Sequence, residues 1–290
     1  MELRILKYFL MVAKEENITK AAHLLYITQP TLSRQLAQLE EELGVKLFKR
    51  SNHKVLLTEE GKLLQRRAEE ILILTEKTKK ELSYDKESVV GEISIGCGEF
   101  LSMDELAQLL SEFQEIYPNV RFDIYSGTAE DIAYKMNQGL LDMGLMFDFI
   151  NKEKYNFIRL KRKEEWGILV RKDNELAQKK NILPENIKDL PLIITRNPLI
   201  QSELANWMGI STGKLNIKST YTLIYNAAMM VKNNMGVAVC LRLENKFDNL
   251  KFIPFYKGAP SRTILAWKPY PKYSAATKEF IKFIEKKRNL

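Results

Sequence analysis

Apolar residues recur at helical spacing along the N-terminal part of the chain. The pattern predicts three helices, near residues 3–13, 19–25 and 29–43. The segment Asn17-Ile18-Thr19 is expected to supply a break and the cap of the second helix, and Thr28 is expected to cap the third, because such side chains can accept a hydrogen bond from the first turn. Pro30 fits the first turn of the third helix, and Gly44 is expected to end it.

Two short strands are predicted next, at 46–50 and 55–57, followed by a long helix that Thr58 caps. Along this helix apolar and threonine positions alternate at spacings of four and three, the pattern of a coiled-coil seam. A seam between two copies of the chain is therefore predicted, although a helix packed on its own domain is the alternative. The predicted seam residues are Leu64, Ala68, Ile71, Thr75, Thr78 and Leu82.

From residue 91 onward, short strand patterns alternate with helical ones. Ser102 is expected to open one helix through a capping box and Thr128 to cap another, and a last helix is expected from Ser274 to about Lys287. This alternation of strands and helices predicts βαβ units around a mostly parallel sheet. For the whole chain, an α+β multidomain fold is predicted. The predicted strands lie near 93–95, 120–124, 141–147, 166–170, 192–195, 217–221, 236–240 and 263–267.

The positive net charge of the chain is consistent with an acidic partner. The formal net charge is +8, of which +3 falls within residues 1–86 and +5 in the remainder. The windows 17–39 and 43–58 contain no acidic residue, and the second carries Lys46, Lys49, Arg50 and Lys54. Such windows suit a nucleic-acid interface, although a solvated basic face gives the same pattern.

Other classes of protein find little support. No apolar run is long enough to span a membrane and no secretory signal opens the chain, so a cytoplasmic protein without membrane contact is expected. Cys97 and Cys240 are predicted to be buried strand cysteines, and neither a metal nor a cofactor is expected. Residues 209–213 match the G-x-S-x-G of hydrolases, but His23 and His53 both precede the serine. A surface turn, and no enzyme, is therefore predicted.

The third helix carries the best functional signal. Pro30, Arg34, Ala37 and Gln38 lie opposite its leucines. Arg can bond bidentately to guanine and Gln to adenine in the major groove, and a basic turn at 49–54 would follow the backbone as a wing. A helical bundle with a solvated polar face would show the same residues.

The first fifty residues, continued by "VLLTEEGKLL" at 55–64, resemble the winged helix-turn-helix of the LysR-type transcriptional regulators. The likeness is weaker in the remainder, where "GEISIG", "PNV", "LDMGL" and "NAAMMVKNNMGVAV" resemble the effector-binding domain of that family. The residues that carry the first likeness are Ala21-Ala22, Gln29-Pro30, Leu32-Ser33, the run from Leu39-Glu40 to Leu47-Phe48, and Leu57-Thr58.

The resemblance implies a DNA-binding domain at 1–58, a linker and dimerisation helix with a hinge at 59–89, and a two-lobed, periplasmic-binding-protein-like α/β domain at 90–290. Lobe I would comprise 91–162 and 267–290, and lobe II 163–266. It further implies a homodimer or homotetramer on promoter DNA, contact with RNA polymerase, and a small-molecule effector between the lobes that modulates promoter binding or DNA bending.

Carried over to this chain, the resemblance nominates ten DNA-binding residues. His53 stands where family members often carry arginine. The nominated residues are Thr28, Gln29, Pro30, Thr31, Ser33, Arg34, Lys49, Arg50, His53 and Lys54.

Effector contacts are expected where strands end and helices begin, because these positions face the crevice of such a fold. Glu99 replaces the usual Ser or Thr, and Arg196 is expected opposite it. A ligand bearing an acid together with an amine or hydroxyl would fit this pair, whereas Glu99 could equally face solvent or pair with a lysine. The nominated residues are Gly98, Glu99, Phe100, Ser102, Gly127, Thr128, Met146, Phe147, Thr195 and Arg196.

Two rival functions remain to be weighed. A solute-binding protein whose N-terminal helices serve only oligomerisation would need an export signal, and an enzyme would need a catalytic set that the sequence does not supply. A ligand-responsive transcription factor is therefore predicted.

Overall fold

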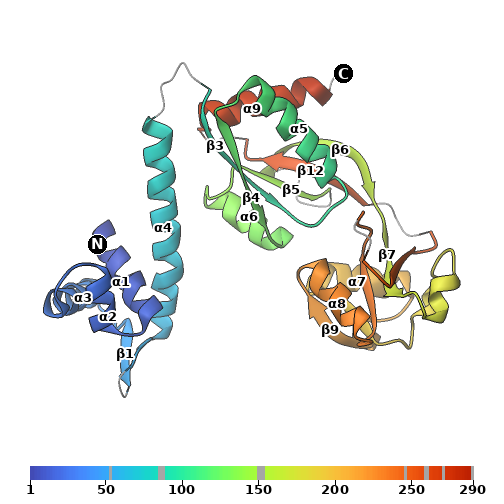
Figure 1. Ribbon diagram of the computed structural model, residues 1–290, viewed down its shortest axis with the longest axis horizontal. Coiled ribbons are helices and arrows are strands. Elements are labelled where there is room, and N and C mark those ends of the chain that lie inside the picture. The colour runs from blue at the N-terminus through green and yellow to red at the C-terminus, as the bar shows by residue number, and fades with distance from the viewer. Residues whose placement is uncertain are drawn as a thin grey trace. The chain divides into compact units, whose positions relative to one another are not determined.

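The computed structural model describes residues 1–51, 54–83, 89–148, 154–244, 247–257, 261–269 and 272–288. The chain divides into two compact units, Met1–Ser83 and Tyr84–Leu290. Figure 1 draws both units. Among the described residues, no helix is long and apolar enough to cross a membrane.

The first unit packs α1 (Leu3–Glu15), α2 (Ile18–Leu24), α3 (Gln29–Leu43) and α4 (Glu59–Ser83) beside the antiparallel hairpin β1 (Phe48–Ser51) and β2 (Lys54–Leu57). Its core contains Phe9, Leu32 and Leu39, which are fully buried. The predicted ends of α3 are confirmed, because Thr28 accepts from Thr31 N and Gly44 ends the helix in the left-handed conformation. Within the segment expected to cap α2, Asn17 is the cap and accepts from Lys20 N.

The second unit holds two five-stranded sheets. The first has the order β4-β3-β5-β12-β6 and the second β11-β7-β10-β8-β9. The strands of the first are β3 (Gly91–Cys97), β4 (Val120–Ser126), β5 (Met143–Phe147), β6 (Asn156–Glu164) and β12 (Ser261–Trp267). Those of the second are β7 (Trp166–Arg171), β8 (Leu192–Thr195), β9 (Ile217–Tyr221), β10 (Val237–Leu241) and β11 (Leu250–Pro254).

Helices cover both faces of each sheet. In lobe I, α5 (Met103–Ile116) and α9 (Ala275–Arg288) share one core, and α6 (Ala129–Asn137) packs in another on the opposite face. In lobe II, α7 (Pro198–Trp207) and α8 (Ile224–Lys232) pack in separate cores. Short 3₁₀ turns follow β7 and α7, at Glu175–Gln178, Pro184–Asn186 and Thr212–Lys214. The predicted two-lobed α/β architecture is thus observed.

The prediction of a mostly parallel sheet is wrong. In lobe I, β3 pairs parallel with β4 and β5, whereas β12 pairs antiparallel with β5 and β6. Lobe II repeats this mixture, with β7 antiparallel to β10 and β11. Strands β6 and β11 were not predicted. Because β12 begins at Ser261, residues 261–266 belong with the first sheet, although the prediction had placed them in lobe II.

The predicted capping box at Ser102 is also wrong. The Ser102 side chain makes no cap hydrogen bond. Its buried hydroxyl accepts instead from the Thr263 hydroxyl at 2.8 Å. Thr128 behaves as predicted, because it and Asp131 form a complete capping box at the start of α6. Local spacing marked both Ser102 and Thr128 as candidate caps. The Ser102 hydroxyl, however, bonds to Thr263, which is distant in the sequence, instead of capping its own helix.

Candidate DNA-binding surface and effector cleft

Arg34 is the one charged residue in the first eleven positions of α3, Gln29–Leu39, whereas Glu41 and Glu42 are exposed in its last turn. Leu32, Leu36 and Leu39 are buried in the core of the first unit, and Arg34 is exposed on the other side. Among the described acidic residues, none forms an ion pair with Arg34. Its guanidinium therefore remains available to a base edge or phosphate. The other nominated residues on this surface are exposed or half-buried: Thr28, Gln29, Pro30, Thr31 and Ser33.

Hydrogen bonds order this surface in the absence of DNA. The Gln29 side-chain amide donates to Ser33 Oγ at 2.8 Å, and the hydroxyls of Thr28 and Thr31 lie 2.8 Å apart. Such bonds hold the side chains at the start of α3 in defined rotamers, which reduces the entropy lost when a ligand orders them.

The hairpin contributes two lysines whose surroundings differ. Lys49 is exposed, whereas Lys54 Nζ lies 2.8 Å from the Glu16 carboxylate at the end of α1. The hydrogen bond and charge of Glu16 raise the pKa of Lys54. A phosphate must therefore compete with Glu16 for this ammonium group. The side chain of Arg50 and the whole of His53 lie outside the described residues.

Glu40 fixes the end of α3 to the start of the hairpin and was missed by the sequence reasoning. Its carboxylate accepts from Leu47 N at 2.8 Å and Phe48 N at 3.3 Å, and Lys46 Nζ lies 2.7 Å away. Partial burial opposes ionisation, but these donors together lower the pKa of Glu40. Strand β1 begins at Phe48 rather than at the predicted Lys46.

Tyr26 is a second residue that the sequence reasoning missed. It lies in the turn between α2 and α3, with a left-handed backbone (φ 55°) and 93% of its surface exposed. The sequence signal for Tyr26 was its position, because it is a large aromatic residue two positions before Thr28, the cap of α3.

A cavity of about 120 Å³ lies between the lobes of the second unit. All of the nominated effector residues except Ser102 and Arg196 line it. Ser102 is buried against Thr263, and the Arg196 N–H donates to Tyr221 O in the sheet of lobe II. The lining also includes residues that were not nominated, chiefly Ile132, Trp166, Asn197, Tyr221, Thr222 and Ile224.

The side chain of Glu99, from lobe I, lines this cavity and bonds to lobe II. Its carboxylate accepts a hydrogen bond from Ile224 N, the first residue of α8, so a lobe I side chain closes the N-terminus of a lobe II helix. Burial raises the pKa of Glu99, and the bond to Ile224 offsets part of the rise. Neither of the two earlier interpretations, a solvent-facing Glu99 or a lysine partner, describes this arrangement.

Two family models divide the chain between them. The model described as a bacterial regulatory helix-turn-helix protein of the lysR family matches residues 3–62, and the LysR substrate binding domain matches residues 86–288. The chain belongs to the LysR family. It is thus a DNA-binding transcriptional regulator with an effector-binding domain, and the alternative of a solute-binding protein loses its basis.

Individual relatives agree with this assignment. The LysR-type chain is 28% identical to the transcriptional regulator CysL of Bacillus subtilis, over 82% of this chain and 80% of that protein. It is also 28% identical to the Hca operon transcriptional activator HcaR of Escherichia coli, over 99% and 98%. The crystal structure of full-length CbnR with its target DNA matches with a TM-score of 0.77 at 20% identity, over 99% of both chains, which shows the shared fold.

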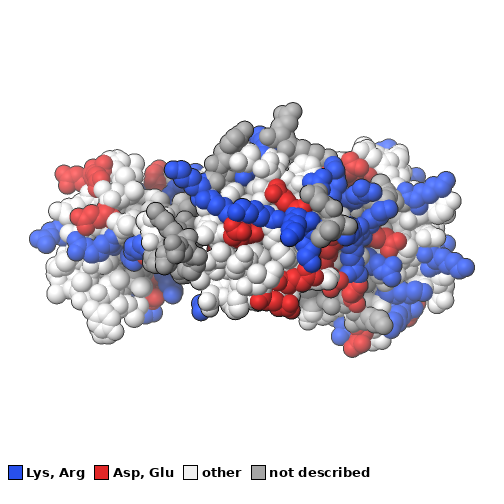
Figure 2. Space-filling view, turned by 90° about the horizontal axis from the view of Figure 1, so that it is seen from above, with Lys and Arg blue, Asp and Glu red and all other residues white. Residues whose placement is uncertain are grey.

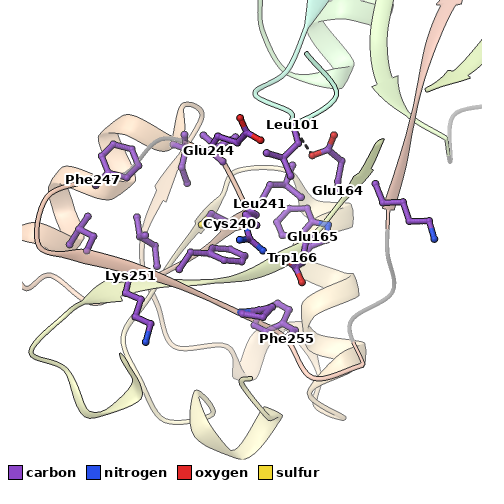
Figure 3. A pocket seen from close by; sticks show the side chains of 18 of the residues that line it. Leu101, Glu164, Glu165, Trp166, Cys240, Leu241, Glu244, Phe247, Lys251 and Phe255 are labelled. Atoms are coloured by element: carbon purple, nitrogen blue, oxygen red, sulfur yellow. Dashed lines mark hydrogen bonds and ion pairs between the residues drawn. The ribbon is translucent and has the colours of Figure 1, made fainter. Parts of the chain in front are cut away.

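The LysR-type fold also has a larger hollow at the junction of its lobes, of about 1140 Å³ (Figure 3). The fully buried Glu164, at the end of β6, accepts from Leu101 N at 2.9 Å and Ser102 N at 3.0 Å. Nearby, Arg162 pairs with Asp104 of lobe I and Glu244 of lobe II. None of these partners was predicted from the sequence, since the strand that ends at Glu164 was not predicted.

Basic side chains are spread over the face shown in Figure 2 rather than gathered in one patch. Net charge alone therefore does not locate the DNA interface of this LysR-type regulator. The two cysteines are buried and free, and burial raises the pKa of both thiols. Residues 209–213 form an exposed turn that ends α7 and leads into a 3₁₀ turn. Among the described residues, no cluster of potential metal ligands occurs.

Proposed function

We propose that this LysR-type regulator reads promoter DNA with the start of α3, while Lys49 and Lys54 hold the phosphate backbone. The observation that carries the proposal is the exposed Arg34, the one charged residue between Gln29 and Leu39 of α3. A helix of this character enters the major groove in helix-turn-helix proteins, with its N-terminal residues at the base edges. Arg50 and His53 remain nominated contacts on the same hairpin.

We further propose that two or four copies assemble through α4. The exposed apolar side chains of this helix are Leu63, Ile73 and Leu82. Only Leu82 belongs to the seam predicted from the sequence, because Leu64, Ala68 and Ile71 pack into the core of their own unit. The hydroxyls of Thr75 and Thr78 donate to Ile71 O and Leu74 O of the same helix. A dimer would place two α3 helices on one operator, and RNA polymerase would be contacted at the promoter.

The cavity between the lobes is proposed to bind a small-molecule effector that changes promoter binding or DNA bending. Such a ligand acts only if it binds one state of the protein better than another. Lobe-to-lobe bonds such as Glu99 to Ile224 N and Asn197 to Glu130 are the contacts that a ligand could rearrange.

Fluorescence anisotropy with DNA from upstream of the protein's own gene, and with a shuffled duplex, tests the DNA-binding part. Arg34→Ala is expected to lose about 1–3 kcal/mol per half-site on the native fragment and less on the shuffled one. Arg121→Ala is the matched control, because Arg121 is an exposed arginine on β4 of the other unit. Equal losses on both duplexes would make Arg34 a phosphate contact instead. Absence of binding to either duplex at low salt would refute the proposal.

A further inference from the structure

Helix N-termini usually supply the anion-binding groups of a two-lobed cleft, because their N–H groups and dipoles point at the ligand. Three helices begin at the wall of the cavity described above, and each start is already bonded to a protein oxygen. The α6 start is closed by Thr128 and Asp131, and the α7 start by Asn197, which accepts from Leu199 N at 2.9 Å. The α8 start is closed by Glu99. One N–H group at each of these helix starts is therefore already occupied, which leaves fewer of them for an anionic ligand.

The cavity wall itself is negative. Glu99 is the one charged side chain among the described residues that line it. Its Oε2 accepts from Ile224 N, whereas no hydrogen bond to Oε1 is formed by any described residue. A carboxylate oxygen that still has acceptor capacity favours a ligand that donates hydrogen bonds, and most of all one that carries positive charge.

Four aromatic residues line the same cavity, and the rings of three of them, Phe100, Phe147 and Trp166, contact one another in series. The ring centroids of Phe100 and Phe147 lie 4.9 Å apart, and those of Phe147 and Trp166 lie 6.2 Å apart. Aromatic faces attract cations through their quadrupoles, and the attraction is stronger where water is excluded. The aromatic rings and the Glu99 carboxylate are independent features that favour the same ligand charge.

We propose that the effector of this regulator is a small organic cation, a primary amine or quaternary ammonium recognised by Glu99 and by the rings of Phe100, Phe147 and Trp166. The proposal rests on the effector function proposed above and specifies its ligand class. The volume of about 120 Å³ limits the ligand to a few non-hydrogen atoms. Of the ligand expected from the sequence, the amine is retained and the acid is dropped, because Arg196 does not line the cavity.

Butylammonium, butanol and butyrate test the proposal, because they share a four-carbon skeleton and differ in charge. Each is titrated into the full-length protein by isothermal calorimetry at neutral pH. The wild type is expected to bind butylammonium at least about tenfold more tightly than the other two, as a hydrogen bond between charged groups would provide. Glu99→Gln, which is nearly isosteric, is expected to remove this preference.

Glu130→Gln is the matched control, since Glu130 also joins the lobes, through Asn197, but does not line the cavity. It should keep the preference for butylammonium. Tightest binding of butyrate, equal binding of all three probes, or no binding of any probe would each overturn the cation proposal. Operator binding measured on the same samples keeps the two proposals distinct. Cation binding without operator binding refutes only the regulator function, and operator binding altered by butyrate refutes only the ligand class.

Discussion

At the scale of single residues, the identity of a hydrogen-bonding partner decides what a side chain does. Thr28 and Thr128 were predictable as helix caps because their partners lie three residues away. Ser102 has the same local signature, yet its N–H donates to Glu164, 62 residues along the chain. Glu40 and Glu99 likewise bond to backbone groups that only the fold brings near.

The pairing of Lys54 with Glu16 leads to a prediction about DNA affinity. Glu16→Gln should strengthen binding to specific and random duplexes alike, because it releases the Lys54 ammonium for a phosphate. Lys54→Ala should weaken binding to both and reduce the slope of log affinity against log salt by about one or less. Anisotropy titrations at several salt concentrations measure both effects. An unchanged slope in both variants would exclude Lys54 from the interface.

The burial of Glu99 leads to a prediction about stability and pH. Its pKa is raised above the ordinary value of 4.5, so the folded state holds this proton more tightly than the unfolded chain does. The free energy of unfolding that depends on Glu99 should therefore fall as pH rises through the interval above 4.5. Tyr221 and Cys240, which face Glu99, have raised pKa values of their own and stay protonated there.

Urea unfolding of the wild type and of Glu99→Gln between about pH 4 and pH 7 isolates this contribution. The difference in unfolding free energy, wild type minus variant, should decrease with rising pH. Groups such as Glu40, whose pKa is lowered, act in the opposite sense but are common to both proteins and cancel. A difference that is flat with pH would show that Glu99 has the same pKa in the folded and unfolded chain.

At the scale of elements, periodicity identified helices and strands but not which elements they pair with. Strand β6, which was not predicted, has only two apolar residues that alternate with charged ones, Ile158 and Leu160, before Lys161, Arg162 and Lys163 follow one another. On α4, the four-three spacing correctly marked one apolar face, but the core of the first unit covers part of that face. A sequence pattern reports that a face will be buried, and not what buries it.

Self-association through α4 should depend on Ile73 rather than on Ile71. Ile73 is 51% exposed, whereas Ile71 packs against the core of its own unit. Ile73→Ser should shift the protein toward monomer in sedimentation velocity experiments and leave its melting temperature nearly unchanged, apart from any stabilisation due to assembly. Ile71→Ser, the control on the same helix, should instead lower the melting temperature. A dimer of unchanged affinity in Ile73→Ser would place the interface elsewhere.

At the scale of the whole molecule, the change of hydrophobic period near residue 90 was enough to predict two parts of different class. The internal connectivity of the second part was harder to predict, because β12 returns to the sheet of β5 and β6 after the whole of lobe II has intervened. Pairings between strands so far apart in sequence leave no local signal.

The two-unit organisation predicts that damage to the second unit spares the fold of the first. Glu164 is fully buried, and both its oxygens accept backbone N–H groups at the start of α5. Glu164→Gln replaces one acceptor with a donor, so it should destabilise the unit Tyr84–Leu290 by about 1–3 kcal/mol. The unit Met1–Ser83 has a core of its own and should retain both its fold and its affinity for random DNA. Limited proteolysis would then show faster cleavage in the second unit alone, whereas equal loss in both units would mean that they unfold as one.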